Sequence, residues 1–209
     1  MDFKTLADQY RNELLDNVLP FWLEHSQDLE FGGYFTCLDR KGGVFDTDKF
    51  IWLQGREVWM FSMLYNKVEK RQEWLDCAVQ GGEFLKKYGH NGDYNWYFSL
   101  NRSGRPLVEP YNIFSYTFAT MAFGQLSLAT GSQEYADIAK KTFEIILSKV
   151  DNPKGKWNKL HPDTRNLKNF ALPMILCNLA LEIEHLLDPG YLEQTMETCI
   201  HEVMNLSLI

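Results

Sequence analysis

The four cysteines of this 209-residue chain form no CxxC pair. Cys37, Cys77, Cys177 and Cys199 stand far apart, whereas zinc ligands and redox disulfides usually come as closely spaced pairs. The five histidines include no i, i+4 pair of the kind that binds a metal on one face of a helix. The spacing therefore predicts reduced, mostly buried thiols and no metal site.

Long runs of one residue type are also missing. No lysine and arginine run occurs, and the formal net charge is -7 with a pI near 5.3, so we do not expect nucleic acid as a partner. Residues 1–5 lack the apolar core of a signal peptide, and no apolar run reaches the ~20 residues of a membrane span. A cytoplasmic protein without membrane contacts is expected.

The chain does carry the composition of a folded core, with 45% hydrophobic and 14% aromatic residues. No linker-like segment interrupts it, so residues 1–209 are expected to form a single domain. Hydrophobic periodicity is helical throughout. It predicts seven helices, over residues 3–27, 50–69, 72–89, 112–130, 132–150, 168–187 and 190–206.

Two connections between these helices share one pattern. Residues 34–43 and 97–105 each read as a short aromatic strand, a turn built on Asp or Asn with Gly, and a returning strand, which is typical of a β-hairpin. They recur at every second connection. Helical pairs with longer loops at one end indicate a toroid of antiparallel helices, in which inner and outer helices alternate and the loops cap a pocket.

Arg56 stands among aromatic residues on a helix that otherwise reads as buried. A buried guanidinium requires carboxylates, carbonyls or an oxygen-rich ligand to satisfy its five donors. Just upstream, residues 31–35 (FGGYF) supply a flexible backbone with aromatic rings. Together the two segments predict the lining of a sugar-sized pocket.

Several segments extend this pattern along the chain: GGYF at 32–35, LDR at 38–40, Lys49, WLQGR at 52–56, YFSLNRSGRP at 97–106, the helix over 114–131, and LKNFALPMIL at 167–176. They resemble the N-acylglucosamine 2-epimerase family over nearly the whole chain. The resemblance implies an all-α, (α/α)6-toroid fold with short β-hairpins in its loops. Family members are roughly twice as long, with twelve helices and two catalytic histidines in their second half, so this chain is expected to be an incomplete N-terminal half.

Epimerisation at C2 of an N-acyl sugar removes the proton next to the C1 carbonyl and returns it to the other face. That chemistry needs a base, most often histidine, and a cation that stabilises the developing enolate oxygen. The resemblance aligns Arg56 with the essential arginine of the family, and a permanently charged planar fork suits the second need. The alternative is that Arg56 only ties Glu57 or a loop carboxylate.

Four further residues are expected to contact the sugar. Tyr34 and Trp52 offer aromatic faces and a phenol, while Trp59, at helical spacing from Trp52, is expected to pack. Asn178, buried by its apolar flanks, either reads a hydroxyl or N-acetyl group or bonds a neighbouring loop. His161 is the histidine best placed in a loop to approach the pocket. No residue here inherits the role of the catalytic histidines.

The sequence thus predicts a truncated sugar epimerase that interconverts N-acetylglucosamine and N-acetylmannosamine, needs no cofactor, and by resemblance has ATP as an activator, although no GxxxxGK[ST] loop is present. One alternative is a non-catalytic carbohydrate-binding or assembly module that needs a partner to complete the barrel. Another is a glycoside hydrolase, for which no carboxylate pair stands out. Because an incomplete ring exposes apolar edges, a homodimer is expected.

Overall fold

The computed structural model describes residues 2–110, 113–150 and 171–206. Its first element is one continuous rod made of α1 (Phe3–Glu13), the π-helical η1 (Leu14–Val18) and α2 (Leu19–His25). Asp2 begins the rod as an N-cap that accepts from the backbone N–H of Lys4. The rod matches the helix predicted over residues 3–27.

The rest of the described chain folds into three antiparallel helical pairs, whose bounds agree with the predicted helices to within a few residues. Gly131, in the left-handed conformation at φ +71°, ends one helix, and Ser132 caps the next through its hydroxyl. The elements are α3 (Ile51–Lys67) with α4 (Gln72–Tyr88), α5 (Phe114–Thr130) with α6 (Gln133–Ser148), and α7 (Ala171–Glu182), η3 (Glu184–Leu186), α8 (Pro189–His201) and η4 (Glu202–Leu206).

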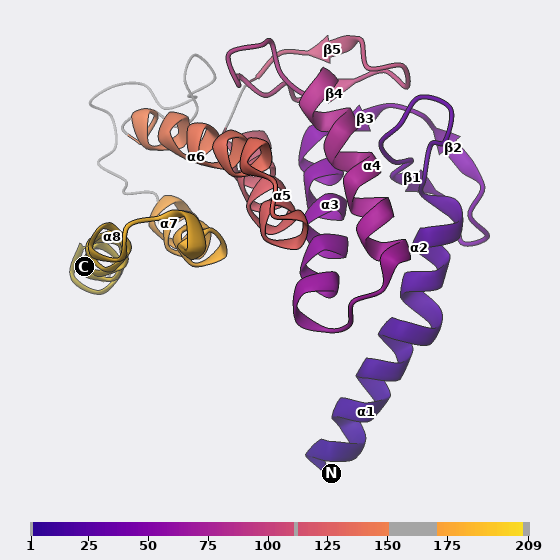
Figure 1. The fold of residues 1–209 in the computed structure, drawn as a ribbon, viewed down its shortest axis with the longest axis horizontal. Coiled ribbons are helices and arrows are strands. Elements are labelled where there is room, and N and C mark those ends of the chain that lie inside the picture. The colour runs from indigo at the N-terminus through magenta and orange to yellow at the C-terminus, as the bar shows by residue number, and fades with distance from the viewer. Residues whose placement is uncertain (1, 111–112, 151–170, 207–209) are drawn as a thin grey trace.

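These helices form two rows (Figure 1). In the inner row α3 packs on α5 and α5 on α7, while α4, α6 and α8 back their respective partners from outside. Two glycines permit the close approach within the inner row: a Cβ on Gly55 would lie 2.8 Å from the carbonyl oxygen of Phe118, and one on Gly124 would lie 2.6 Å from Ile183. Helix α5, in the middle of the row, is therefore buried along most of its length.

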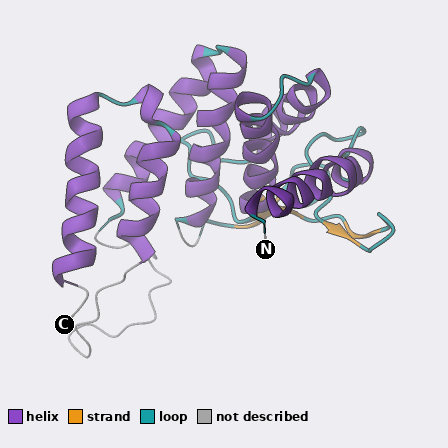
Figure 2. Ribbon diagram, turned by 90° about the horizontal axis from the view of Figure 1, so that it is seen from below, coloured by secondary structure: helices purple, strands orange, loops and turns teal. Residues whose placement is uncertain are grey.

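Five short strands lie in the loops of the described residues, and four of them form the two predicted hairpins. Strands β1 (Cys37–Leu38) and β2 (Val44–Asp46) pair antiparallel, and so do β4 (Ser99–Leu100) and β5 (Pro106–Val108). The sequence did not reveal β3 (Lys49–Phe50), which pairs with β4 and leads directly into α3. The helical array with the strands at one edge is seen from below in Figure 2.

A buried ion cluster fastens the loops to one another. The ammonium of Lys49 donates to Asp28 Oδ2 and to the carbonyl of Arg102, both at 2.9 Å, and to the carbonyl of Gly32. The guanidinium of Arg102 donates to both oxygens of the same carboxylate, from Nε to Oδ2 at 2.9 Å and from Nη2 to Oδ1 at 3.0 Å. The side chains of Asp28 and Lys49 are fully buried. Because the bonded residues come from the loop before β1, from strand β3 and from the turn of the β4–β5 hairpin, the cluster holds these three segments together.

All four cysteines are free thiols, as predicted, with Cys77 and Cys199 buried and the other two half-buried. In the described part of the chain, each helix is too short or too polar to cross a bilayer.

Candidate functional site

Helix α3 turns three residues toward the inner face, which we define as the side of α3, α5 and α7 facing away from α4, α6 and α8. Trp52, Arg56 and Trp59 follow one another at spacings of four and three residues, so they lie along one side of the helix. Apolar residues on the other sides of α3, such as Val58 and Phe61, are fully buried against the neighbouring helices.

Arg56 is exposed on this face, although its apolar neighbours along the sequence predicted burial. Its guanidinium carbon lies 4.6 Å from the ring centroid of Phe118 on α5 and 5.3 Å from that of Trp52. No carboxylate of the described residues lies within ion-pair distance of it, so a tie to Glu57 is not what positions Arg56. Two aromatic rings thus hold an unpaired cation at the surface of the inner face, where its donors are open to a ligand.

One turn further along α3, a polar network joins the three inner helices. The indole N–H of Trp59 donates to Glu182 Oε2 of α7 at 2.9 Å, and the amide of Gln125 on α5 donates to the same oxygen at 3.0 Å. Asn66 donates to Gln125 Oε1, which fixes the orientation of that amide. The sequence predicted that Trp59 only packs, and it did not point to Glu182, which lies 123 residues from Trp59 along the chain. The only signal for Trp59 was its spacing of three residues from Arg56.

Tyr34 does not lie beside Arg56, and this corrects the expected arrangement of the pocket. Its side chain is fully buried, and its hydroxyl donates to the carbonyl of Cys77 on α4 at 2.7 Å. The ring lies against Gly81, where any Cβ would collide with it, so the missing side chain on α4 decides where the tyrosine goes. No ring face of Tyr34 is left for a sugar.

Glu57 lies on the side of α3 that faces away from the inner face, and it is buried there. Burial raises the pKa of this carboxyl to about 8, and a hydrogen bond from Ser26 offsets only part of the effect. Its Oε1 atom has no hydrogen-bond partner among the described residues. Glu57 is therefore a neutral carboxylic acid in the core at pH 7, and it takes no part in the inner face.

The two remaining predicted contacts have different outcomes. Asn178 is exposed on α7 rather than buried, because the apolar flanks that suggested burial lie on other sides of the helix. It precedes Glu182 by four residues and so shares the inner face with it. His161 lies outside the described residues.

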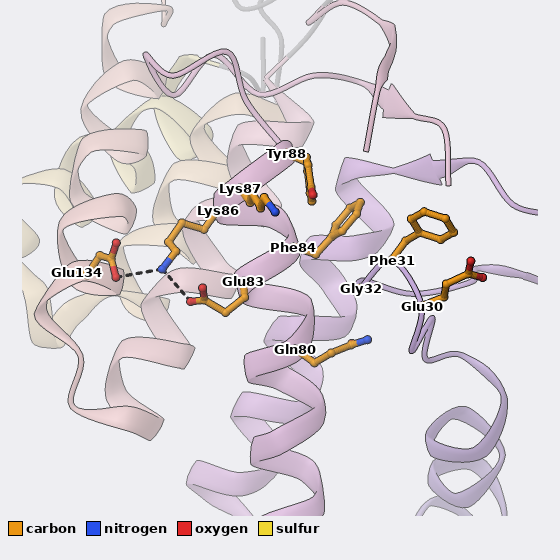
Figure 3. A pocket seen from close by; sticks show the side chains of 10 residues that line it. All are labelled: Glu30, Phe31, Gly32, Gln80, Glu83, Phe84, Lys86, Lys87, Tyr88 and Glu134. Atoms are coloured by element: carbon orange, nitrogen blue, oxygen red, sulfur yellow. Dashed lines mark hydrogen bonds and ion pairs between the residues drawn. The ribbon is translucent and has the colours of Figure 1, made fainter. Parts of the chain in front are cut away.

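A separate hollow of about 640 Å³ lies on the outer side, between α4, the loop at residues 30–32 and Glu134 of α6 (Figure 3). Its Lys86 is engaged by Glu83 at 2.9 Å and by Glu134 at 3.1 Å. Three carboxylates and two ammonium groups line the hollow, so its charge does not favour phosphate. Within the described residues, no three His, Cys, Asp or Glu side chains gather closely enough to hold a metal.

Comparison with known proteins gives concordant matches. The family profile of N-acylglucosamine 2-epimerase covers residues 33–207. N-acylglucosamine 2-epimerase of Bos taurus is 41% identical over 174 residues, which are 81% of this chain and 41% of the bovine protein. A sugar epimerase from a ruminal bacterium has a TM-score of 0.81 at 21% identity, over 96% of this chain and 55% of that one.

Cellobiose 2-epimerase from Spirochaeta thermophila gives a TM-score of 0.79 at 19% identity, over 97% of this chain and 54% of that one. These structures confirm the predicted fold class, an all-α architecture of the (α/α)6-toroid type with short hairpins in the loops. The chain spans about half the length of the proteins that it matches.

Proposed function

The chain belongs to the N-acylglucosamine 2-epimerase family, and on that premise we propose that its inner face binds the sugar of a C2 epimerisation between N-acetylglucosamine and N-acetylmannosamine. The observation that carries the proposal is the exposed, unpaired guanidinium of Arg56 between Trp52 and Phe118. A permanent cation beside an aromatic surface suits an enolate oxygen at C1 of an opened sugar. Proton removal and return leave the oxidation state of the sugar unchanged, so no redox cofactor is needed.

Replacing Arg56 with alanine is expected to weaken binding of N-acetylglucosamine by roughly tenfold or more, because a charge-assisted hydrogen bond contributes about 1.5–3 kcal/mol. Isothermal titration calorimetry on the 209-residue protein measures this. Arg71→Ala, which removes an arginine from the far end of the chain's first helical pair, is the matched control and should bind as the wild type does. Equal affinity of the Arg56 variant and the wild type would remove the assignment.

The 209 residues alone are expected to show no measurable epimerisation of N-acetylglucosamine. The resemblance places both catalytic histidines outside this sequence, and loss of a general base removes at least about 10²-fold of rate. The assay follows formation of N-acetylmannosamine by chromatography at a high enzyme concentration. Turnover that disappears in the Arg56→Ala variant would show that a histidine within this chain supplies the base.

A second candidate function, a sugar-binding module that needs a partner, is favoured by apolar side chains at both ends of the array. Phe3 and Tyr10 of α1 are 86% and 70% exposed, and Met174 of α7 and Ile200 of α8 are 55% and 53% exposed. Surfaces of this kind usually mark an interface.

A homodimer is the simplest cover for these ends, since a two-fold interface uses each patch twice. Light scattering at micromolar concentration is expected to give the mass of a dimer. Replacing Phe3 and Tyr10 together with serine should shift the population to monomer, whereas a wild-type monomer that binds no hydrophobic dye would contradict the dimer. A cytoplasmic location and activation by ATP stay predictions of the sequence.

A further inference from the structure

We propose that Trp59 and Glu182 form a sugar-contacting pair on the inner face, with the indole as a platform for the pyranose and Glu182 Oε1 as the acceptor for one of its hydroxyls. The proposal rests on the function proposed above and adds two contacts to it. The ligand class is a neutral pyranose, which presents C–H groups to an aromatic face and hydroxyls to a carboxylate.

The first step of the argument is the occupancy of the two carboxylate oxygens. Both donors that reach Glu182, the indole N–H of Trp59 and the amide of Gln125, end on Oε2. Among the described residues no donor reaches Oε1. The side chain is partly exposed, and no lysine or arginine of the described residues pairs with it. The side chain of Glu182 thus keeps one acceptor oxygen open toward the inner face.

The second step is the rigidity of the pair. Gln125 Nε2 also donates to the backbone carbonyl of Glu182 at 3.3 Å. The side-chain amide of Asn66 in turn donates to the backbone carbonyl of Gln125 at 2.9 Å. The carboxylate therefore connects α3, α5 and α7, and its orientation is fixed before any ligand arrives. Preorganised acceptors of this kind bind without losing side-chain entropy at the moment of binding.

The third step is position. Trp59 follows Arg56 by three residues on α3, and Glu182 follows Asn178 by four residues on α7. Each member of the pair therefore lies one helical turn C-terminal to a residue of the site already described. Sugar bound at Arg56 therefore has the Trp59–Glu182 pair next along the inner face.

Glu182→Gln separates a contact role from a structural role. The glutamine oxygen can replace Oε2 and keep both donors satisfied, and this places an NH2 group, a donor, where Oε1 was. The overall fold is thereby preserved while the open acceptor is lost. Glu184→Gln, an exposed neighbour in η3, is the matched control.

The test is calorimetric titration with N-acetylglucosamine, with the thermal midpoint of each variant measured alongside. Glu182→Gln is expected to bind roughly 10- to 100-fold more weakly at an unchanged midpoint, as loss of a charged hydrogen bond predicts. Trp59→Leu, which removes the platform together with the indole donor to Glu182 Oε2, is expected to lose about tenfold in affinity. Glu184→Gln should match the wild type.

Affinities of Glu182→Gln and Trp59→Leu within about twofold of the wild type, together with weakened binding by Arg56→Ala, would overturn this inference and leave the proposed function standing. Absence of binding by the wild type would overturn both. If Glu182→Gln fails to fold, the Trp59→Leu titration decides, since it tests the other member of the same pair.

Discussion

Replacing Asp28 with asparagine is expected to lower the free energy of unfolding by roughly 3–5 kcal/mol, because the change removes the counter-charge of a buried lysine. Lys49 is fully buried and has this carboxylate as its partner at 2.9 Å. Burial lowers the pKa of the Lys49 ammonium although Asp28 acts to raise it. The intact cluster therefore adds little net stability, whereas breaking it leaves the buried ammonium with two carbonyl acceptors and no buried counter-charge.

Urea denaturation at pH 7 measures the effect, with Glu30→Gln as the matched control. Glu30 also pairs with Arg102, at 2.9 Å, but its side chain is largely exposed, so its loss should change stability by less than about 1 kcal/mol. Stability of Asp28→Asn within that same margin of the wild type would show that Lys49 finds another partner or loses its proton.

The same cluster predicts how the wild type responds to acid. Burial alone would raise the pKa of Asp28, but the hydrogen bonds from Arg102 and Lys49 outweigh it and bring the value down to about 2, from 3.8 in the unfolded chain. The contribution of Asp28 is therefore fully present above pH 3.8 and is lost as the pH falls toward 2.

The helices and hairpins were predictable because each is encoded locally. Periodic apolar residues, Gly131 after α5 and the Asp188 cap before α8 all act within a few residues of the element that they define. Strand β3 was not predictable in the same way, since its two residues become a strand only by pairing with β4 about fifty residues later.

The site was predictable in its first residue and not in its neighbours. Arg56 is identified by its surroundings in the sequence, yet its exposure depends on which side of α3 faces α5. Asn178 was expected to be buried for the same reason, since apolar flanks in sequence lie on other sides of a helix. The place of Tyr34 depends on Gly81, 47 residues away on α4, and that of Glu182 on the indole of Trp59. Contacts over such separations leave no local signal.

Replacing Glu57 with glutamine is expected to remove the loss of stability that this carboxyl causes as the pH rises. The carboxyl has a pKa of about 8 when folded and 4.5 when unfolded, because burial disfavours its charged form. As the pH rises from 4.5 to 8, the unfolded chain releases this proton while the folded chain retains it, so stability falls across that window and is constant above it. The full loss is at most roughly 5 kcal/mol, from about 1.4 kcal/mol per pKa unit.

Glutamine copies the shape of the protonated acid but has no proton to lose, so the variant should keep its stability where the wild type weakens. At pH 5 it should be equal or slightly less stable, since the second amide hydrogen lacks an acceptor beside the unpartnered Oε1 position. At pH 9 it should be the more stable protein by a few kcal/mol. Denaturation curves at pH 5 and pH 9 test this change in which protein is the more stable, and Glu73→Gln, at an exposed position of α4, is the control. Parallel pH profiles of stability for Glu57→Gln and the wild type would mean that the carboxyl is ionised, and therefore solvated or paired, in the folded chain.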